Sequence, residues 1–292
     1  MNRRAVFAAG IALSLICASS ARGAYSPATT NGWFITSGHV LGTGNALFQT
    51  DIWLFNPDPA ADVTVTLVFH PAVVSGGAAA ASISSGPIVL APRETRFFSD
   101  VTSSTVPAGN GLVGALEWQS SAAIMGFGRI YTFSPSGTYG FDLPAIPQSE
   151  SMTAKVSASD SANVLQMYGM DSGDTNFRTN LDITNTSDVT LPIEVNVIDP
   201  TTSEIFGGTR TYSIAPRSLM RLLGYLVTIG APVEDGLRIT VGVAAGTTIP
   251  AGGVFAAAYT LDDRTSDAFA FVGQRQSATI VPAEAIPFDV RP

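Results

Sequence analysis

The sequence FQTDIWLFNP at residues 48–57 decides the fold of this chain, because it returns as FRTNLDITNT at residues 177–186. The second stretch begins 129 residues after the first (177 minus 48). Side chains of a β-strand alternate between two faces, and every second position is similar in the two stretches. The similar positions are Phe48, Thr50, Ile52, Leu54 and Asn56, and then Phe177, Thr179, Leu181, Ile183 and Asn185. The intervening positions differ, which predicts two copies of a strand with one face in a core and the other face free.

The rest of the sequence predicts an all-β chain with two tandem antiparallel β-sandwich domains. Short apolar and β-branched runs are separated by turn residues at intervals of about ten residues. Other signals recur: Ala-Pro-Arg at 91–93 and 215–217, Gly-Leu at 111–112 and 236–237, and Tyr-Thr at 131–132 and 259–260. The expected boundaries are a signal peptide at 1–23, a first domain at 24–146, a linker at 147–162, a second domain at 163–276 and a C-terminal tail at 277–292.

The N-terminal residues predict export. Arg3 and Arg4 precede an apolar run at 5–16, which is shorter than the roughly 20 residues that a membrane-spanning helix needs. Small residues and a possible cleavage site at 21–23 follow, as in a secretory signal peptide. We therefore expect a secreted protein, periplasmic or extracellular, with no integral membrane segment in the mature chain. The single cysteine, Cys17, lies in the signal peptide, so the mature chain should hold no disulfide and no thiol nucleophile.

The composition argues against nucleic acid as a partner. Charged residues make up 13% of the chain and the formal net charge is −8, whereas typical soluble proteins have about 25% charged residues. Binding to phosphates needs clustered Lys and Arg, and the sequence has no such cluster.

The residues that usually carry catalysis are scarce. The two histidines, His39 and His70, are interpreted as surface or loop residues, because no nucleophile-elbow sequence accompanies them. Glu94, Glu117 and Asp100 are interpreted as solvated residues at strand ends. We therefore expect no enzymatic activity.

Asp262, Asp263 and Asp267 form the densest acidic loop of the sequence. Calcium binds several oxygens from one loop, but the spacing of an EF-hand is missing. A calcium site and a plain polar turn both remain open for this loop. No other cofactor is expected.

Trp53 and Phe55 are the candidate ligand-binding residues. They lie on the face that differs between the copies, where the second copy has Asp182 and Thr184. Exposed aromatic residues on a sheet often mark a binding or domain contact. The alternatives are cover by a loop or the linker, and binding of a protein partner or a surface glycan.

Several motifs carry a family resemblance: GHVLG at 38–42, TDIWLFNP at 50–57, SGTYG at 136–140, RTNL at 178–181 and DDRTSD at 262–267. With these motifs the chain resembles a group of secreted bacterial tandem immunoglobulin-like β-sandwich proteins of uncharacterised function. The resemblance implies immunoglobulin-like folds and no assigned activity. Each half also resembles the sandwiches of pilus chaperones and major sperm proteins, with an Asn-Pro turn and a later x-Pro-x turn, but the paired basic anchors of a chaperone are not recognisable.

These features together predict a non-catalytic secreted module for adhesion or cell-surface binding. The alternative is a periplasmic chaperone-like carrier that binds extended clients by adding a strand to a sheet edge.

Overall fold

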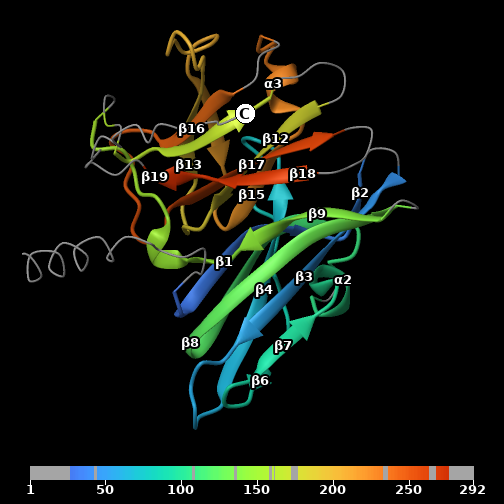
Figure 1. Cartoon of the computed structure of the whole chain (residues 1–292). Coiled ribbons are helices and arrows are strands. Elements are labelled where there is room, and N and C mark those ends of the chain that lie inside the picture. Colours follow the sequence, from blue (N-terminus) through green and yellow to red (C-terminus); the bar gives the residue numbers. More distant parts are fainter. Residues whose placement is uncertain are drawn as a thin grey trace, which may run out of the picture.

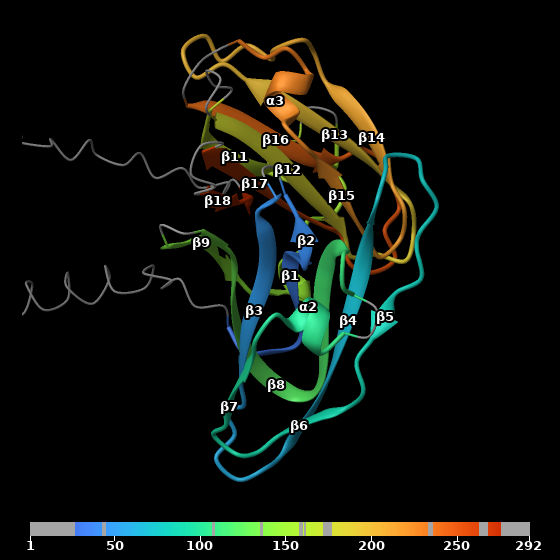
Figure 2. The same ribbon diagram turned by 90° about the vertical axis from the view of Figure 1, so that its right-hand side faces the viewer.

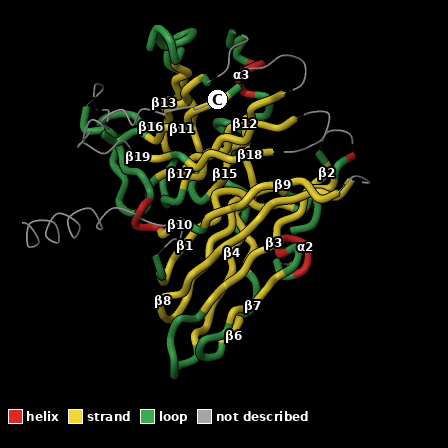
Figure 3. The backbone as a smooth tube through the Cα atoms, viewed as in Figure 1, coloured by secondary structure: helices red, strands yellow, loops and turns green. Residues whose placement is uncertain are grey.

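A computed structural model describes residues 27–42, 45–106, 109–134, 137–157, 160, 162–171, 177–232, 236–262 and 268–275. The predicted signal peptide and C-terminal tail lie outside the described residues. The described chain is predominantly β (Figure 3), as the sequence predicted. It also has two single-turn helices, α2 (Val101–Ser104) and α3 (Tyr225–Thr228), and one 3-10 turn, η3 (Gln148–Glu150). None of the helices in this part of the chain has the length and apolar character to cross a membrane.

The first half of the chain forms two sheets, which share one long strand. Sheet A consists of β1 (Thr29–Gly38), β4 (Val63–Val73), β5 (Ile83–Ser84), β6 (Ile88–Leu90), β10 (Ile146–Pro147) and the first part of β8 (Val113–Ser134). Sheet B consists of β2 (Val40–Leu41), β3 (Leu47–Phe55), β7 (Thr95–Phe98), β9 (Gly137–Pro144) and the second part of β8. β8 pairs with β4 as far as Ser120 and with β3 from Met125 onwards, so it passes from one sheet to the other.

The second half forms two further sheets. Sheet C consists of β12 (Phe177–Asn185), β15 (Ser218–Leu222), β17 (Val254–Asp262) and β18 (Ala268–Val272). Sheet D consists of β11 (Leu165–Met170), β13 (Leu191–Ile198), β14 (Arg210–Ile214), β16 (Leu237–Val243) and β19 (Gln274–Arg275). Two separate strands take the place of β8 in the second half. β16 corresponds to the first part of β8, and β17 corresponds to its second part. The loop between them contains Pro250, which has no N–H to donate to a ladder.

The same order of strand pairing occurs in both halves. β3 lies between β7 and β8 in sheet B, and β12 lies between β15 and β17 in sheet C. β8 lies between β1 and β4 in sheet A, and β16 lies between β11 and β13 in sheet D.

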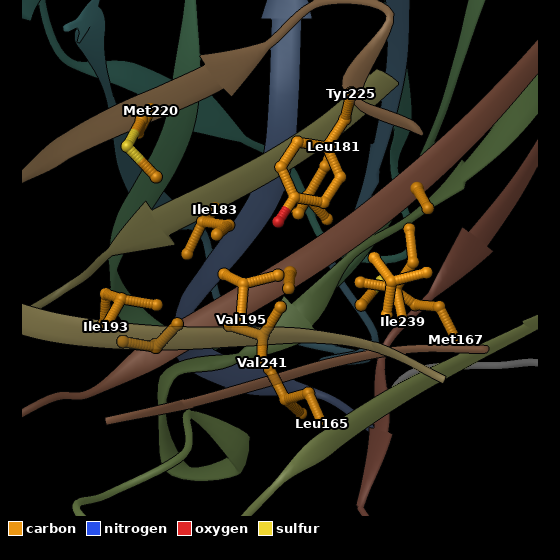
Figure 4. Close-up of a cluster of buried hydrophobic side chains, with 14 of the residues drawn as sticks. Leu165, Met167, Leu181, Ile183, Ile193, Val195, Met220, Tyr225, Ile239 and Val241 are labelled. Atoms are coloured by element: carbon orange, nitrogen blue, oxygen red, sulfur yellow. The ribbon is translucent and has the colours of Figure 1, made fainter. Parts of the chain in front are cut away.

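Each half has its own hydrophobic core between its two sheets. Ile52 and Leu54 are fully buried between sheets A and B, and Leu181 and Ile183 are fully buried between sheets C and D. Figure 4 shows the second core, where Leu181 and Ile183 meet residues of sheet D such as Val195. The prediction that the matching parity of the two repeated stretches faces a core is therefore confirmed.

A third hydrophobic cluster joins the halves, which are stacked along the long axis of the molecule (Figures 1 and 2). The outer face of sheet A contributes Trp33, Ile35 and Ala115, all fully buried. The outer face of sheet C contributes Leu219, Phe255, Ala257, Tyr259, Leu261 and Ala268. A short parallel pairing of β4 with β15 links the ladders into a 14-stranded sheet, beside the 5-stranded sheet D.

This contact overturns one expectation. The differing face of the second copy was predicted to be free, but Asp182 and Thr184 on β12 are fully buried. The hydroxyl of Thr184 donates to the backbone oxygen of Ile35 at 2.8 Å, across the contact between the halves. The segment predicted as a linker is also packed, because Met152 is fully buried in the core of the second half and Lys155 pairs with Glu194.

One buried asparagine closes the repeated stretch in each half. The side-chain nitrogen of Asn56 donates to three backbone oxygens, of Ala61, Leu90 and Ala91, at 2.9, 3.2 and 3.0 Å. Asn185 does the same with the backbone oxygens of Val189, Ile214 and Ala215, at 2.8, 3.1 and 2.9 Å. Both residues are fully buried. Each asparagine therefore ties the end of its strand to two loops.

Unusual backbone conformations recur as well. Arg93 and Arg217, in the two Ala-Pro-Arg turns, have φ of 59° and 45°, a conformation that is uncommon for residues other than glycine. Asp100 and Gly224 precede the two single-turn helices with φ of 46° and 52°. The recurring sequence signals thus mark recurring backbone geometry.

The two Tyr-Thr pairs do not occupy equivalent places in the ladders. Tyr131 lies opposite Gln49, whereas Tyr259 lies opposite Asn180. Asn180 corresponds to Asp51 in the repeated stretches, and Asp51 lies opposite Arg129. Tyr259 therefore occupies the position that Arg129 has in the first half. The predicted equivalence of Tyr131 and Tyr259 is wrong by two residues.

We expect Asn56→Ala and Asn185→Ala each to lower the free energy of unfolding by about 2–4 kcal/mol, because three backbone carbonyls lose a fully buried donor. Urea denaturation measures this change. Asn196→Ala, which removes a single 3.3 Å bond to Thr240, is the matched control and should cost less than about 1 kcal/mol. Equal losses for all three variants would contradict the assigned role.

Candidate functional site

The outer face of sheet B carries an aromatic cluster centred on Trp53. Across the ladders, Trp53 lies directly opposite Phe97 on β7 and Phe127 on β8. Its ring stacks on Phe97 with 4.8 Å between centroids and lies 5.7 Å from Phe127. Phe97 is 48% exposed and Phe127 is 43% exposed. These rings form a partly exposed apolar surface on the outer face of sheet B.

Arg129 places a fixed cation beside these rings. Its guanidinium carbon lies 5.6 Å from the centroid of Trp53, within the range of a cation–π contact. Two of its nitrogens donate to Asp51 Oδ2 at 3.0 and 2.7 Å. Asp51 is 1% exposed, and its other oxygen accepts the backbone N–H of Asp100 at 2.8 Å. The buried carboxylate of Asp51 therefore fixes the position of Arg129, while the arginine side chain remains 44% exposed.

Phe55 extends the same face. It lies two residues after Trp53 on β3, half-buried, opposite Thr95 and Met125. We call Trp53, Phe55, Phe97, Phe127 and Arg129 the aromatic face. β3, β7 and β8, which carry it, are labelled in Figure 1.

The sequence pattern indicated Trp53 and Phe55 but not the other three members. In β8 the residues Phe127, Arg129, Tyr131 and Phe133 occur at every second position. That alternation was a usable signal, because it places all four on one face of a strand. Phe97 could not be found in this way, because a strand of four residues leaves its pairing partner undetermined.

The corresponding positions of the second half have a different chemistry. Asp182 and Arg221 stand directly opposite each other on β12 and β15, as Trp53 and Phe97 do on β3 and β7. Arg221 donates to Asp182 at 2.8 Å through Nε and at 2.5 Å through Nη2. Nη2 also donates to the hydroxyl of Thr36 in the first half, at 2.7 Å. An ion pair that holds the halves together thus replaces a stacked aromatic pair that faces outwards.

The acidic loop is only partly described. Asp262 is the last residue of β17, and Asp263 and Asp267 lie outside the described residues. In the ranges that the structure describes, no group of three or more His, Cys, Asp or Glu residues is placed to hold a metal ion. Calcium binding at this loop stays a prediction.

His70 and Glu117 are buried, contrary to the expectation of a surface histidine and a solvated strand end. They are 3% and 1% exposed, and His70 Nε2 lies 2.9 Å from Glu117 Oε2. Glu117 also accepts hydrogen bonds from Asn31 at 2.7 Å and Gln119 at 3.1 Å. Burial alone would raise the pKa of Glu117, but these hydrogen bonds outweigh burial and hold the pKa below its ordinary value.

This network also reaches the second half and the surface. Arg217, on the turn before β15, lies 3.5 Å from Glu117 and over the ring of Trp33, which stacks on His70 at 4.9 Å. The exposed Ser82 lies 2.8 Å from His70 Nδ1. A hydroxyl, an imidazole and a carboxylate are thus in line, the order found in serine hydrolases. Because Arg217 of the second half contacts Glu117 and Trp33 of the first half, we assign the network to fastening the halves.

The other two carboxylates are bound locally. Asp100 Oδ2 lies 2.7 Å from His39 Nδ1 and accepts a hydrogen bond from Gln49 at 3.0 Å. Glu94 accepts the backbone N–H of Ala91 at 2.6 Å, which lowers its pKa. These contacts stabilise the turn before β7 and the entry to α2.

The sequence matches no family model and no curated protein. Among solved structures it is similar to a protein of Parabacteroides distasonis that is described as a candidate secreted protein. The two share 11% identity over 80% of this chain and 73% of that chain, with a TM-score of 0.19. A TM-score this low carries no argument about fold or function.

We expect Glu117→Gln to lower the free energy of unfolding at pH 7 by about 2 kcal/mol, because the buried network loses the charge and one acceptor oxygen of the carboxylate. The folded pKa of Glu117 lies below the ordinary value of 4.5, so the stabilisation is present above pH 4.5 and is lost as the pH falls through the folded pKa. The native protein should therefore lose stability faster than the variant as the pH falls below 4.5. Urea titrations over this range measure the difference.

The control is Glu204→Gln, since Glu204 is exposed. It should leave both the stability and its dependence on pH unchanged. Parallel acid profiles for the native protein and Glu117→Gln would contradict the assignment.

Proposed function

We propose that this protein is a secreted, non-catalytic module that binds surface glycans through the aromatic face and acts in adhesion. One observation carries the proposal. Trp53, Phe97 and Phe127 remain partly exposed on the outer face of sheet B. The matching positions Asp182, Arg221 and Ala257 of sheet C lie within the contact between the halves.

We further propose that the halves are tandem immunoglobulin-like sandwiches derived from one ancestral unit. The repeated pairing order of the strands, the two buried asparagines and the recurring positive φ angles support this proposal. In this proposal the copies diverged on the outer face of the sheet that contains the repeated strand, which is sheet B in the first half and sheet C in the second. One copy adapted that face to pack inside the molecule, and the other kept it for a ligand outside.

A glycan fits the chemistry of this face. The face of an aromatic ring carries partial negative charge, and the C–H groups on one side of a sugar ring carry partial positive charge. A sugar can therefore lie flat on Phe97 and Phe127, which flank Trp53. Arg129, fixed by Asp51, offers donors to sugar hydroxyls at the rim. Hydroxyl-rich ligands also suit a site with one cation and mostly apolar atoms.

The alternative, strand addition to an extended client, needs an open sheet edge. β9, with eight residues, is the longest strand at an edge of sheet B. The two proposals differ in what remains bound after purification. A chaperone-like carrier retains an extended polypeptide, whereas a glycan-binding module is retained on polysaccharide and released by soluble sugar.

We expect Trp53→Ala and Phe55→Ser, tested singly, to weaken binding to glycan arrays and to polysaccharide particles. The loss should be at least tenfold for Trp53→Ala, because a central aromatic contact of a binding site contributes about 2 kcal/mol or more. Circular dichroism and thermal unfolding show whether each variant folds.

The matched control is Phe269→Ala, since Phe269 is 42% exposed on β18 of the second half. It should bind like the native protein. If Trp53→Ala folds and binds glycans as tightly as the control, the proposal is wrong. If it fails to fold, Phe127→Tyr, which retains the ring and alters its edge, tests the same face.

A further inference from the structure

A cavity of about 570 Å³ lies at one end of the contact between the two halves. Its volume falls within the ~300–1,000 Å³ that is typical of small-molecule sites. The first half contributes residues of β1, β2, β3, β8 and β9, and the second half contributes residues of β12, β15 and β17. The cavity is therefore formed only when the halves are packed together. Its apolar walls include Val40, Phe48, Val113, Phe141 and Leu261.

The polar part of the lining consists mainly of hydrogen-bond donors. The described residues around the cavity include two arginines, Arg178 and Arg221, and neither Asp nor Glu. Asp182, which lies outside the lining, balances the charge of Arg221. Arg221 is held by Asp182 and by Thr36, so it is positioned before any ligand arrives. The lining offers guanidinium donors and, among the described residues, no carboxylate, so it suits an anion better than a cation.

Tyr259, one of the residues that line the same cavity, has a buried hydroxyl. The residue is 3% exposed, and its ring packs on Phe141 with 4.8 Å between centroids. Its hydroxyl has no hydrogen-bond partner among the described residues. Burial, with a smaller contribution from Asp182, raises the pKa of Tyr259 well above its ordinary value, so the hydroxyl keeps its proton. A buried donor without a partner is costly, and an acceptor in the cavity removes that cost.

We propose that this cavity binds a small amphipathic carboxylate. The carboxylate accepts a hydrogen bond from the hydroxyl of Tyr259 beside Arg221, and the hydrocarbon part packs against the apolar wall. Charge complementarity and the unpaired hydroxyl select the anion, and the apolar walls select the chain or ring attached to it. This site is separate from the aromatic face and does not depend on the proposed glycan binding.

Isothermal titration calorimetry of the full-length mature protein with dodecanoate tests the proposal. Dodecanol, which has the same chain and no charge, is the matched ligand. We expect dodecanoate to bind with one site per chain and dodecanol to bind at least tenfold more weakly. Tyr259→Phe should weaken dodecanoate binding about tenfold or more, the effect of a hydrogen bond to a charged group. The variant keeps the ring that packs on Phe141 and should not unfold at a lower temperature.

Tyr168→Phe, on the 50% exposed Tyr168 of β11, is the matched control and should leave binding unchanged. Arg178→Gln should weaken dodecanoate binding more than dodecanol binding. The proposal is overturned if dodecanoate does not bind, if dodecanol binds equally well, or if Tyr259→Phe binds dodecanoate like the native protein. It is also overturned if Trp53→Ala abolishes the binding, because the ligand then lies on the aromatic face.

Discussion

The dry contact between the outer faces of sheets A and C is the constraint on which the rest of the molecule depends. Trp33 and Ile35 on β1 cover Phe255 and Ala257 on β17, without water-accessible surface on most of these side chains. Burial of this area contributes stability in proportion to the apolar surface removed from water. This contact also buries the side chains on the outer face of β12, such as Asp182 and Thr184. A buried polar side chain at these positions needs a hydrogen-bond or ion-pair partner. Arg221 is the partner of Asp182.

Directional contacts surround this dry centre and fix how the halves meet. The ion pair of Asp182 with Arg221, extended to Thr36, lies on one side of it. The network of Glu117 and Arg217 lies near Trp33 on another side. Apolar contacts alone tolerate sliding, whereas buried polar pairs lose much of their energy when misaligned. The combination sets one relative orientation, and with it the shape of the cavity that both halves line.

The sequence predicted the burial of residues whose environment is set by their own strand. It did not predict the burial of residues whose partners lie on distant strands. The alternation of Thr50, Ile52 and Leu54 identified a core face, and the pair Asn56 and Asn185 identified equivalent strand ends. Burial of Asp182 was not predictable, because its partner Arg221 stands 39 residues away in the chain, and Arg221 in turn bonds to Thr36, 185 residues away. His70 and Glu117 were misread for the same reason. Trp53 was identified because the second copy has a different residue at its position. Phe97 was identified only by the pairing of β3 with β7 in the structure.

The unbroken β8 gives the first half a mechanical character that the second half lacks. Its 22 residues run through both layers, so neither layer can be peeled away while the other keeps its central strand. In the second half a loop separates β16 from β17, and the layers can part more independently. Phe127 and Arg129 stand on this shared strand. In the proposed adhesive role, a pull on a ligand held by these residues would be spread over the ladders of both layers.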